Sequence, residues 1–194
     1  MMQREPIKAP ELDVCHWLNC KEPLSVASLR GKIVALHAFQ MLCPGCVVHG
    51  IPQASSIHEL YPSKQVQVIG LHTVFEHHDV MTIPALKAFV KEYRLQFPIA
   101  IDTPSTSSAE PKTMKKYQLR GTPSLILIDR RGNVRVNHFG RLSDMEVGNL
   151  IGQLLQENSA VPVRQHPSLP EASKSAAQLC SNDGCELPQG EATD

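Results

Sequence analysis

The sequence lacks three features that mark common classes of protein. Its longest apolar runs, such as Ser124–Ile128, are far shorter than the roughly 20 residues that span a bilayer. It has no excess of charge, with 19 Lys and Arg against 19 Asp and Glu, so nothing drives it toward nucleic acid or anionic membranes. Residues 1–8 carry charge and proline where a secretory signal needs an apolar segment. We therefore expect no nucleic-acid partner, no membrane partner and a cytoplasmic location.

Cysteine, in contrast, is present in a distinctive arrangement. The six cysteines form three close pairs: Cys15 and Cys20, Cys43 and Cys46, Cys180 and Cys185. In a reducing compartment such pairs are more often catalytic, redox-sensing or metal-binding than structural. The arrangement therefore indicates thiol chemistry.

The length of 194 residues and the 42% hydrophobic content allow a full core, and they suit one domain with appendages. We expect an N-terminal extension or hairpin over residues 1–31 and an α/β domain over 32–158. Residues 159–194 are rich in Pro, Ser, Ala and Gln with little periodicity, which is typical of a flexible tail.

Hydrophobic periodicity predicts alternating strands and helices in the central region. The expected strands are 32–39, 65–73, 97–101, 124–129 and 134–139, and the expected helices are 46–61, 84–93, 110–119 and 143–155. The last two strands are joined by a turn at 130–133 and form a hairpin. This order predicts a central mixed β-sheet flanked by helices.

The candidate catalytic pair lies in Cys43-Pro-Gly-Cys46, directly after the first buried strand and at the start of a helix. A helix N-terminus favours the thiolate form of cysteine, the form that attacks disulfides. Cys46 follows about one helical turn later, where it can close an intramolecular disulfide and release a bound partner. We expect Cys43 to attack and Cys46 to resolve. The alternatives are two buried structural cysteines or half of a zinc site.

Four segments in this order resemble the thioredoxin superfamily, more narrowly the TlpA-like redoxin branch of thiol-disulfide oxidoreductases, which borders on the AhpC/TSA peroxiredoxins. The segments are 23–32, 43–46, 121–129 and 131–133, and the resemblance covers roughly residues 10–157. It implies a thioredoxin-like fold and an enzyme that reduces or exchanges protein disulfides. Its partners would be protein thiols or disulfides and an upstream reductant, without a cofactor or a bound metal.

The resemblance also implies three further site residues. Pro123 would follow a cis peptide bond beside the cysteines, leaving the Thr122 backbone free to pair with an extended substrate. His37 stands where thioredoxins carry a buried acid that helps to deprotonate the resolving thiol, and imidazole exchanges protons near neutral pH. Alternatively, His37 is a core histidine bonded to a backbone carbonyl. Two positions depart from the family pattern: Leu42 replaces a Trp, and Pro44-Gly45 replaces Gly-Pro.

Two other functions are considered. A peroxiredoxin-like thiol peroxidase commonly has a Thr or Ser shortly before its reactive cysteine, and 40–42 offers no hydroxyl. A thioredoxin scaffold that holds copper or zinc would use cysteines and histidines. The histidines and acid at 72–79 suggest a metal cluster at first sight, but adjacent histidines on regular structure point in different directions, so we expect a solvated loop.

The remaining cysteine pairs leave several readings open. The 15/20 and 180/185 pairs share one spacing, so together they could form a four-cysteine zinc site. The tail pair could instead exchange disulfides with Cys43 and Cys46 as a tethered relay. The simplest reading is a Cys15 buried in an N-terminal hairpin and an exposed thiol pair in the tail.

Overall fold

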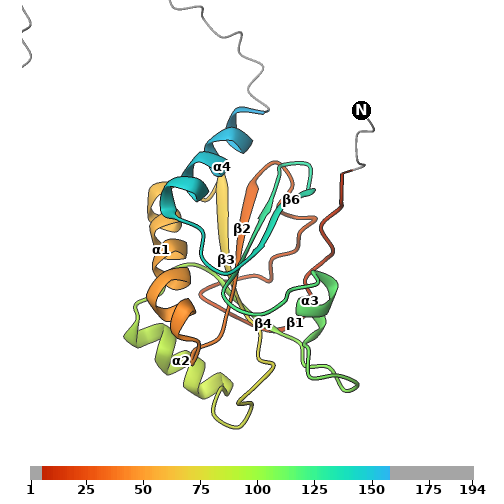
Figure 1. The fold of residues 1–194 in the computed structure, drawn as a ribbon, viewed down its shortest axis with the longest axis vertical. Coiled ribbons are helices and arrows are strands. Elements are labelled where there is room, and N and C mark those ends of the chain that lie inside the picture. The colour runs from red at the N-terminus through yellow and green to blue at the C-terminus, as the bar shows by residue number, and fades with distance from the viewer. Residues whose placement is uncertain (1–5, 158–194) are drawn as a thin grey trace, which may run out of the picture. The chain divides into compact units, whose positions relative to one another are not determined.

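A six-stranded mixed sheet lies at the centre of the fold (Figure 1). The structure is a computed structural model that describes residues 6–157. The strand order is β1-β4-β3-β2-β5-β6, in which β2, β3 and β4 run parallel while β1, β5 and β6 run antiparallel to their neighbours. The strands are β1 (Val14–Leu18), β2 (Ile33–Phe39), β3 (Val66–His72), β4 (Ile99–Asp102), β5 (Ser124–Ile128) and β6 (Val134–Phe139).

Helices cover both faces of this sheet. A π-helical turn η1 (Cys46–Gly50) leads directly into α1 (Ile51–Leu60), and the other helices are α2 (Ile83–Glu92), α3 (Lys112–Lys116) and α4 (Asp144–Gln156). Side chains of α1, α2 and α4 pack into one buried cluster, whereas α3 and the N-terminal segment pack into the other. The sheet is therefore the middle layer of three, as Figure 1 shows.

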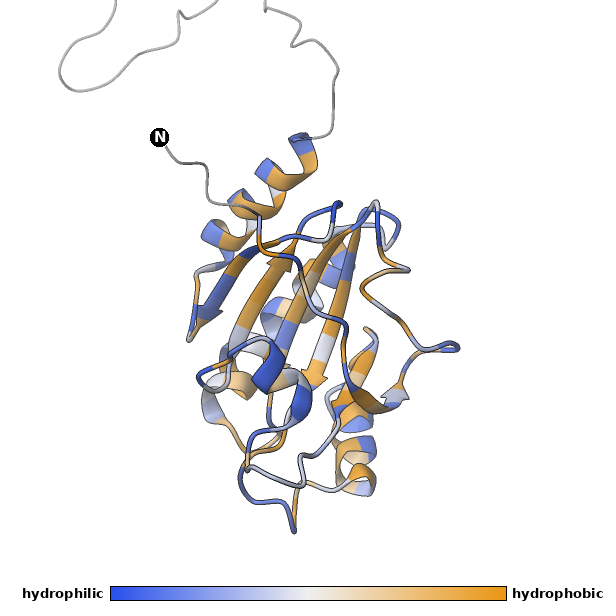
Figure 2. Ribbon diagram, turned by 90° about the vertical axis from the view of Figure 1, so that its right-hand side faces the viewer, coloured by the Kyte–Doolittle hydropathy of each residue, from blue (hydrophilic) through white to orange (hydrophobic). Residues whose placement is uncertain are grey.

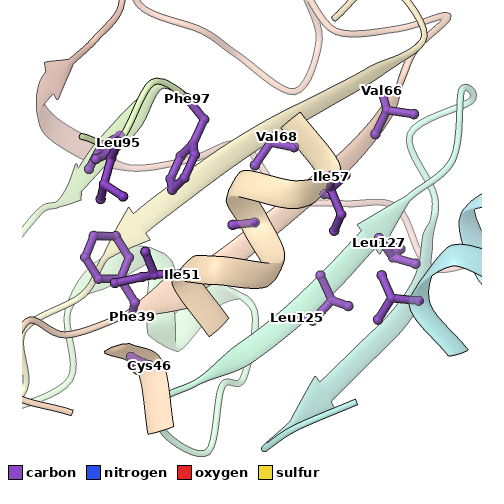
Figure 3. Close-up of a cluster of buried hydrophobic side chains, with 14 of the residues drawn as sticks. Phe39, Cys46, Ile51, Ile57, Val66, Val68, Leu95, Phe97, Leu125 and Leu127 are labelled. Carbon is purple, nitrogen blue, oxygen red and sulfur yellow. The ribbon is translucent and has the colours of Figure 1, made fainter. Parts of the chain in front are cut away.

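The central strands form because they are apolar on both faces. β2 and β3 are buried along their whole length, which is typical of parallel strands covered on both sides. Figure 2 shows these strands as largely hydrophobic ribbons, and Figure 3 shows side chains of β3 and β5 around Ile57 of α1, with Phe39 of β2 beside Ile51. Cys46 belongs to the same cluster, so the second cysteine of the motif is anchored in the core.

The predicted α/β order with a mixed sheet is confirmed, with shifts at the ends of some elements. The strand expected at 97–101 is Ile99–Asp102, and the helix expected at 110–119 is Lys112–Lys116. The first helix begins as the π-helical turn, which hydrophobic spacing does not distinguish from an α-helix. Ser143 and Glu146 form a complete capping box at the start of α4.

The N-terminal segment differs from the expected hairpin. Val14–Leu18 pairs with β4 at the edge of the sheet, and the Glu11 carboxylate accepts hydrogen bonds from the N–H groups of Val26 and Ala27. The described part of this segment is thus part of the domain. Periodicity missed β1 because this edge strand is only partly buried and has no regular apolar alternation.

Two further predictions concern the C-terminal tail and the absence of a membrane-spanning segment. The tail over residues 159–194, with Cys180 and Cys185, lies outside the described residues. Within residues 6–157, none of the helices has both the length and the apolar character needed to cross a bilayer.

Candidate active site

The two motif cysteines lie together where the chain passes from β2 into the helix. The Sγ atoms of Cys43 and Cys46 are 2.7 Å apart, and both residues are free thiols. The Cys46 N–H group donates to Cys43 Sγ at 3.3 Å. A donor aimed at Cys43 Sγ at the start of a helix stabilises negative charge on that atom. The geometry therefore suits Cys43 as the attacking sulfur.

Burial distinguishes the two thiols. Cys43 is partly exposed, whereas Cys46 has 0% of its surface accessible. Burial raises the pKa of the Cys46 thiol to about 12, and its hydrogen bond with Cys43 adds to the increase. Cys46 thus stays protonated near neutral pH and is shielded from partners, as a resolving cysteine should be.

Thr122 and Pro123 lie beside the pair. The Thr122–Pro123 bond is cis, and the Thr122 carbonyl oxygen is 3.4 Å from Cys43 Sγ. The loop is held to the end of β6 because the Gly140 N–H group donates to the Pro123 carbonyl at 2.8 Å. The structure thus brings both residues next to the motif.

The Pro44-Gly45 order has a structural explanation. The Pro123 ring packs so closely on the helix that a Cβ atom at Gly45 would lie 3.2 Å from Pro123 Cδ. A Cβ atom at Gly50 would lie equally close to Pro123 Cβ. Glycine at both positions allows the proline to reach the helix. Gly50 was not identified from the sequence, because a close approach between distant segments leaves no local pattern.

His37 lies on β2, on the same face as Phe39 and the core beneath α1. It lines a cavity of about 260 Å³ together with His49, Pro123 and Arg141, and it is 5% exposed. Burial lowers the pKa of His37 to about 4, so its imidazole is uncharged at neutral pH. Its Nε2 atom has no hydrogen-bond partner within residues 6–157. The alternative prediction, a core histidine bonded to a backbone carbonyl, therefore does not hold for Nε2.

The rim of the site contains residues that the sequence analysis did not single out for function. Phe139, at the end of β6, lies against Gly121, and the Arg120 guanidinium carbon is 5.7 Å from the centre of its ring. Leu42, directly before Cys43, is 58% exposed. Arg120 lies two residues before Thr122, whereas Phe139 is brought to this loop by the pairing of β6 with β5, which hydropathy does not reveal.

The other metal and thiol candidates are not brought together. Among the described residues, His, Cys, Asp and Glu side chains form no group of three or more that could hold a metal ion. His72 is buried in the core against Phe39, while His77 and His78 are exposed, so the expected solvated loop holds only the latter two. Cys15 is exposed and free on β1, which corrects the reading that it is buried in a hairpin.

Fold and site together define a protein of the thioredoxin superfamily with a Cys-x-x-Cys motif at the start of its first helix. The AhpC/TSA family model matches residues 7–137. The chain therefore belongs to the AhpC/TSA family.

Solved structures and a curated relative support this assignment. A thioredoxin-like superfamily protein, SPOA0173, has a TM-score of 0.76 and 52% identity over 78% of this chain and 97% of its own. A thiol-disulfide isomerase from Corynebacterium glutamicum has a TM-score of 0.73 and 56% identity over 77% of this chain and 97% of its own. The thiol-disulfide oxidoreductase ResA of Bacillus cereus is 32% identical over 57% of each chain. The predicted thioredoxin-like fold and redoxin branch are confirmed.

The chain spans 57% of ResA and about a fifth of the longer curated relatives that it matches. The names of the relatives agree with the predicted enzyme class, thiol-disulfide oxidoreductase.

Proposed function

We propose that this protein is a thiol-disulfide oxidoreductase that cycles Cys43 and Cys46 between dithiol and disulfide while it reduces or exchanges protein disulfides. One observation carries the proposal: the two sulfur atoms lie 2.7 Å apart, and Cys43 is partly exposed whereas Cys46 is fully buried. Relatives named as a thiol-disulfide isomerase and a thiol-disulfide oxidoreductase support the same class.

The reaction has two exchanges. The Cys43 thiolate attacks one sulfur of the substrate disulfide, forms a mixed disulfide and expels the first substrate sulfur as a thiolate, which takes up a proton. Cys46 then loses its proton and attacks Cys43 Sγ, which releases the second substrate sulfur. The substrate gains two electrons and two protons, and the protein keeps a Cys43–Cys46 disulfide. An upstream dithiol reductant restores the pair by the reverse exchange.

Thr122 and Pro123 serve as the docking edge in this proposal. Thr122 lies next to Cys43 Sγ, so an extended substrate segment pairing with its backbone would present a disulfide to that sulfur. The family resemblance implies this role, and the contact between Thr122 and Cys43 supports it.

We also propose that His37 accepts the proton of Cys46 during the second exchange. A substrate bound over Cys43 would close the exposed side of the pair, so the Cys46 proton must leave through the protein. β2 packs against η1, and His37 on β2 lines a cavity that Pro123 also lines. The imidazole is uncharged at neutral pH, and its Nε2 atom has no hydrogen-bond partner within residues 6–157, so this nitrogen is open to take a proton while Cys46 attacks.

We therefore expect His37→Leu to slow release from the mixed disulfide by roughly 100-fold and to leave the first attack unchanged. In the wild type, release should decline only as the pH falls through about 4, where His37 becomes protonated. In the variant it should rise about tenfold per pH unit, since Cys46 must then lose its proton directly. Stopped-flow measurement of both steps tests this, with His78→Leu on the exposed loop as control. Equal slowing of both steps would show that His37 has a structural role and does not accept the Cys46 proton.

The proposed activity is tested by turnover with a disulfide-linked peptide and a dithiol reductant, together with redox titration of the Cys43/Cys46 couple. We expect catalytic reduction and a single two-electron transition. Parallel assays with hydrogen peroxide address the thiol peroxidase alternative. Peroxide turnover without peptide turnover would contradict the proposal. The cytoplasmic location stays a prediction, and the measured potential would indicate which compartments suit the couple.

A further inference from the structure

Phe139 lies against the loop that contains Thr122, and Arg120 lies next to its ring; we call these two residues the Phe139 platform. Phe139 is 46% exposed, so nearly half of this apolar side chain is available to contact a partner. Its ring lies against Gly121, where a Cβ atom would be 2.8 Å from Phe139 Cε2. The next residue along the chain is Thr122, whose carbonyl oxygen is 3.4 Å from Cys43 Sγ. A segment docked along the loop at Thr122 would therefore reach the platform.

A hollow of about 270 Å³ adjoins this platform. It is lined by Gln118, Arg120, Asn137, His138 and Phe139, none of which is acidic. The Asn137 side-chain amide donates to the Tyr117 carbonyl at 2.8 Å, which fixes one wall. The lining thus has two basic groups, a fixed polar wall and an aromatic side.

Of the two basic side chains in the hollow, only His138 has an acidic neighbour within the described part of the chain. His138 interacts electrostatically with Glu146 of α4. Within residues 6–157, Arg120 forms no ion pair; the cations that do are Lys112, Lys116 and Arg135. The Arg120 guanidinium carbon lies 5.7 Å from the centre of the Phe139 ring, and such a cation–π contact does not use up the N–H donors, which stay available to another group. A carboxylate matches those donors, because it can accept two parallel hydrogen bonds.

We propose that this hollow is a subsite for an acidic side chain of the substrate, so that the protein favours disulfides whose flanking segment carries Asp or Glu. The proposal rests on the proposed function and names its substrate class. Phe139 would pack on the aliphatic stem of the acidic residue while Arg120 binds its carboxylate. Arg120 is two residues from Thr122, and an extended chain advances about 3.3 Å per residue. The acidic residue is thus expected about two or three positions from the attacked cysteine.

The test uses three disulfide-linked peptides that differ only at the third residue from the cysteine, which is Glu, Gln or Lys. The kcat/KM of the full chain is measured for each at low salt. We expect the wild type to prefer Glu over Lys by roughly tenfold, and we expect added salt to reduce this preference. Arg120→Glu should reverse the order, and Phe139→Ala should lower kcat/KM for the Glu and Gln peptides alike.

Arg94→Glu is the matched control, because Arg94 borders β1, at the opposite edge of the sheet from β6. This charge reversal should leave the preference unchanged. An unaltered Glu preference in Arg120→Glu, or equal rates for all three peptides in the wild type, would overturn the subsite while leaving the proposed function standing. Failure of the wild type to reduce any of the peptides would overturn both.

Discussion

Replacing Cys43 with serine is expected to reduce disulfide turnover to the uncatalysed background, whereas Cys46→Ser is expected to trap substrates as a stable mixed disulfide. The difference follows from exposure: a partner reaches Cys43 from solvent, but it cannot reach Cys46, which is fully buried. Without Cys43 there is no attack. Without Cys46 the first exchange proceeds, and the intramolecular exchange that releases the partner is lost. Intact-protein mass spectrometry under non-reducing conditions measures the trapped species.

Alkylation rates provide an independent measure of the same roles. Because burial raises the pKa of Cys46 to about 12, iodoacetamide at neutral pH should label Cys43 first. Cys20→Ser is a suitable control, since Cys20 is also a free, partly exposed thiol and lies on the N-terminal segment outside the motif. Faster labelling of Cys46, or a Cys46→Ser variant that releases its partner normally, would reverse the assigned roles.

The sequence predicts the inner part of this fold well because burial and hydropathy coincide there. β2 and β3 are buried throughout, and their apolar runs record this directly. The edge strand β1 is only partly covered, so its sequence carries no alternation from which a strand could be inferred. Prediction succeeded where both faces of a strand are covered and failed at this edge.

The candidate site divides in a similar way. Cys43 and Cys46 lie three residues apart in one short motif, and the preceding strand and following helix give them a recognisable context. Thr122 and Pro123 were placed beside them only through family resemblance, which the structure matches in position. Neither local sequence context nor family resemblance pointed to Phe139. Its place at the site follows only from its tertiary contact with the loop at Gly121.

The reversal of Gly-Pro to Pro44-Gly45 shows how one tertiary contact constrains a local motif. Pro123 lies so close to the helix that a side chain at position 45, immediately before the resolving cysteine, would need the proline ring to move by a few tenths of an ångström. Proline at position 44 suits the start of a helix, where its missing N–H group has no intrahelical partner to lose. Both residues therefore have physical reasons for their order.

Glycine-to-alanine substitutions at two positions are expected to change stability in opposite directions. Gly70 lies in the middle of β3, where an added Cβ atom would be 2.8 Å from Phe97 Cε2 and 3.1 Å from Phe39 Cε1. Both rings are almost fully buried, so neither can move without displacing the core around it. We expect Gly70→Ala to lower the free energy of unfolding by about 1–3 kcal/mol. Urea denaturation monitored by circular dichroism measures this change.

Gly148 provides the matched control, because the same methyl group added in α4 meets nothing within 4 Å. Glycine in a helix costs about 0.5–1 kcal/mol relative to alanine, so Gly148→Ala should raise the free energy of unfolding by that amount. The slope of the denaturation curve should be unchanged in both variants if only the native state is affected. A neutral Gly70→Ala would mean that the Phe39 and Phe97 rings have room to shift. The ring of Phe39, the last residue of β2 before the cysteine motif, would then be less tightly packed against β3 than the contact distances indicate.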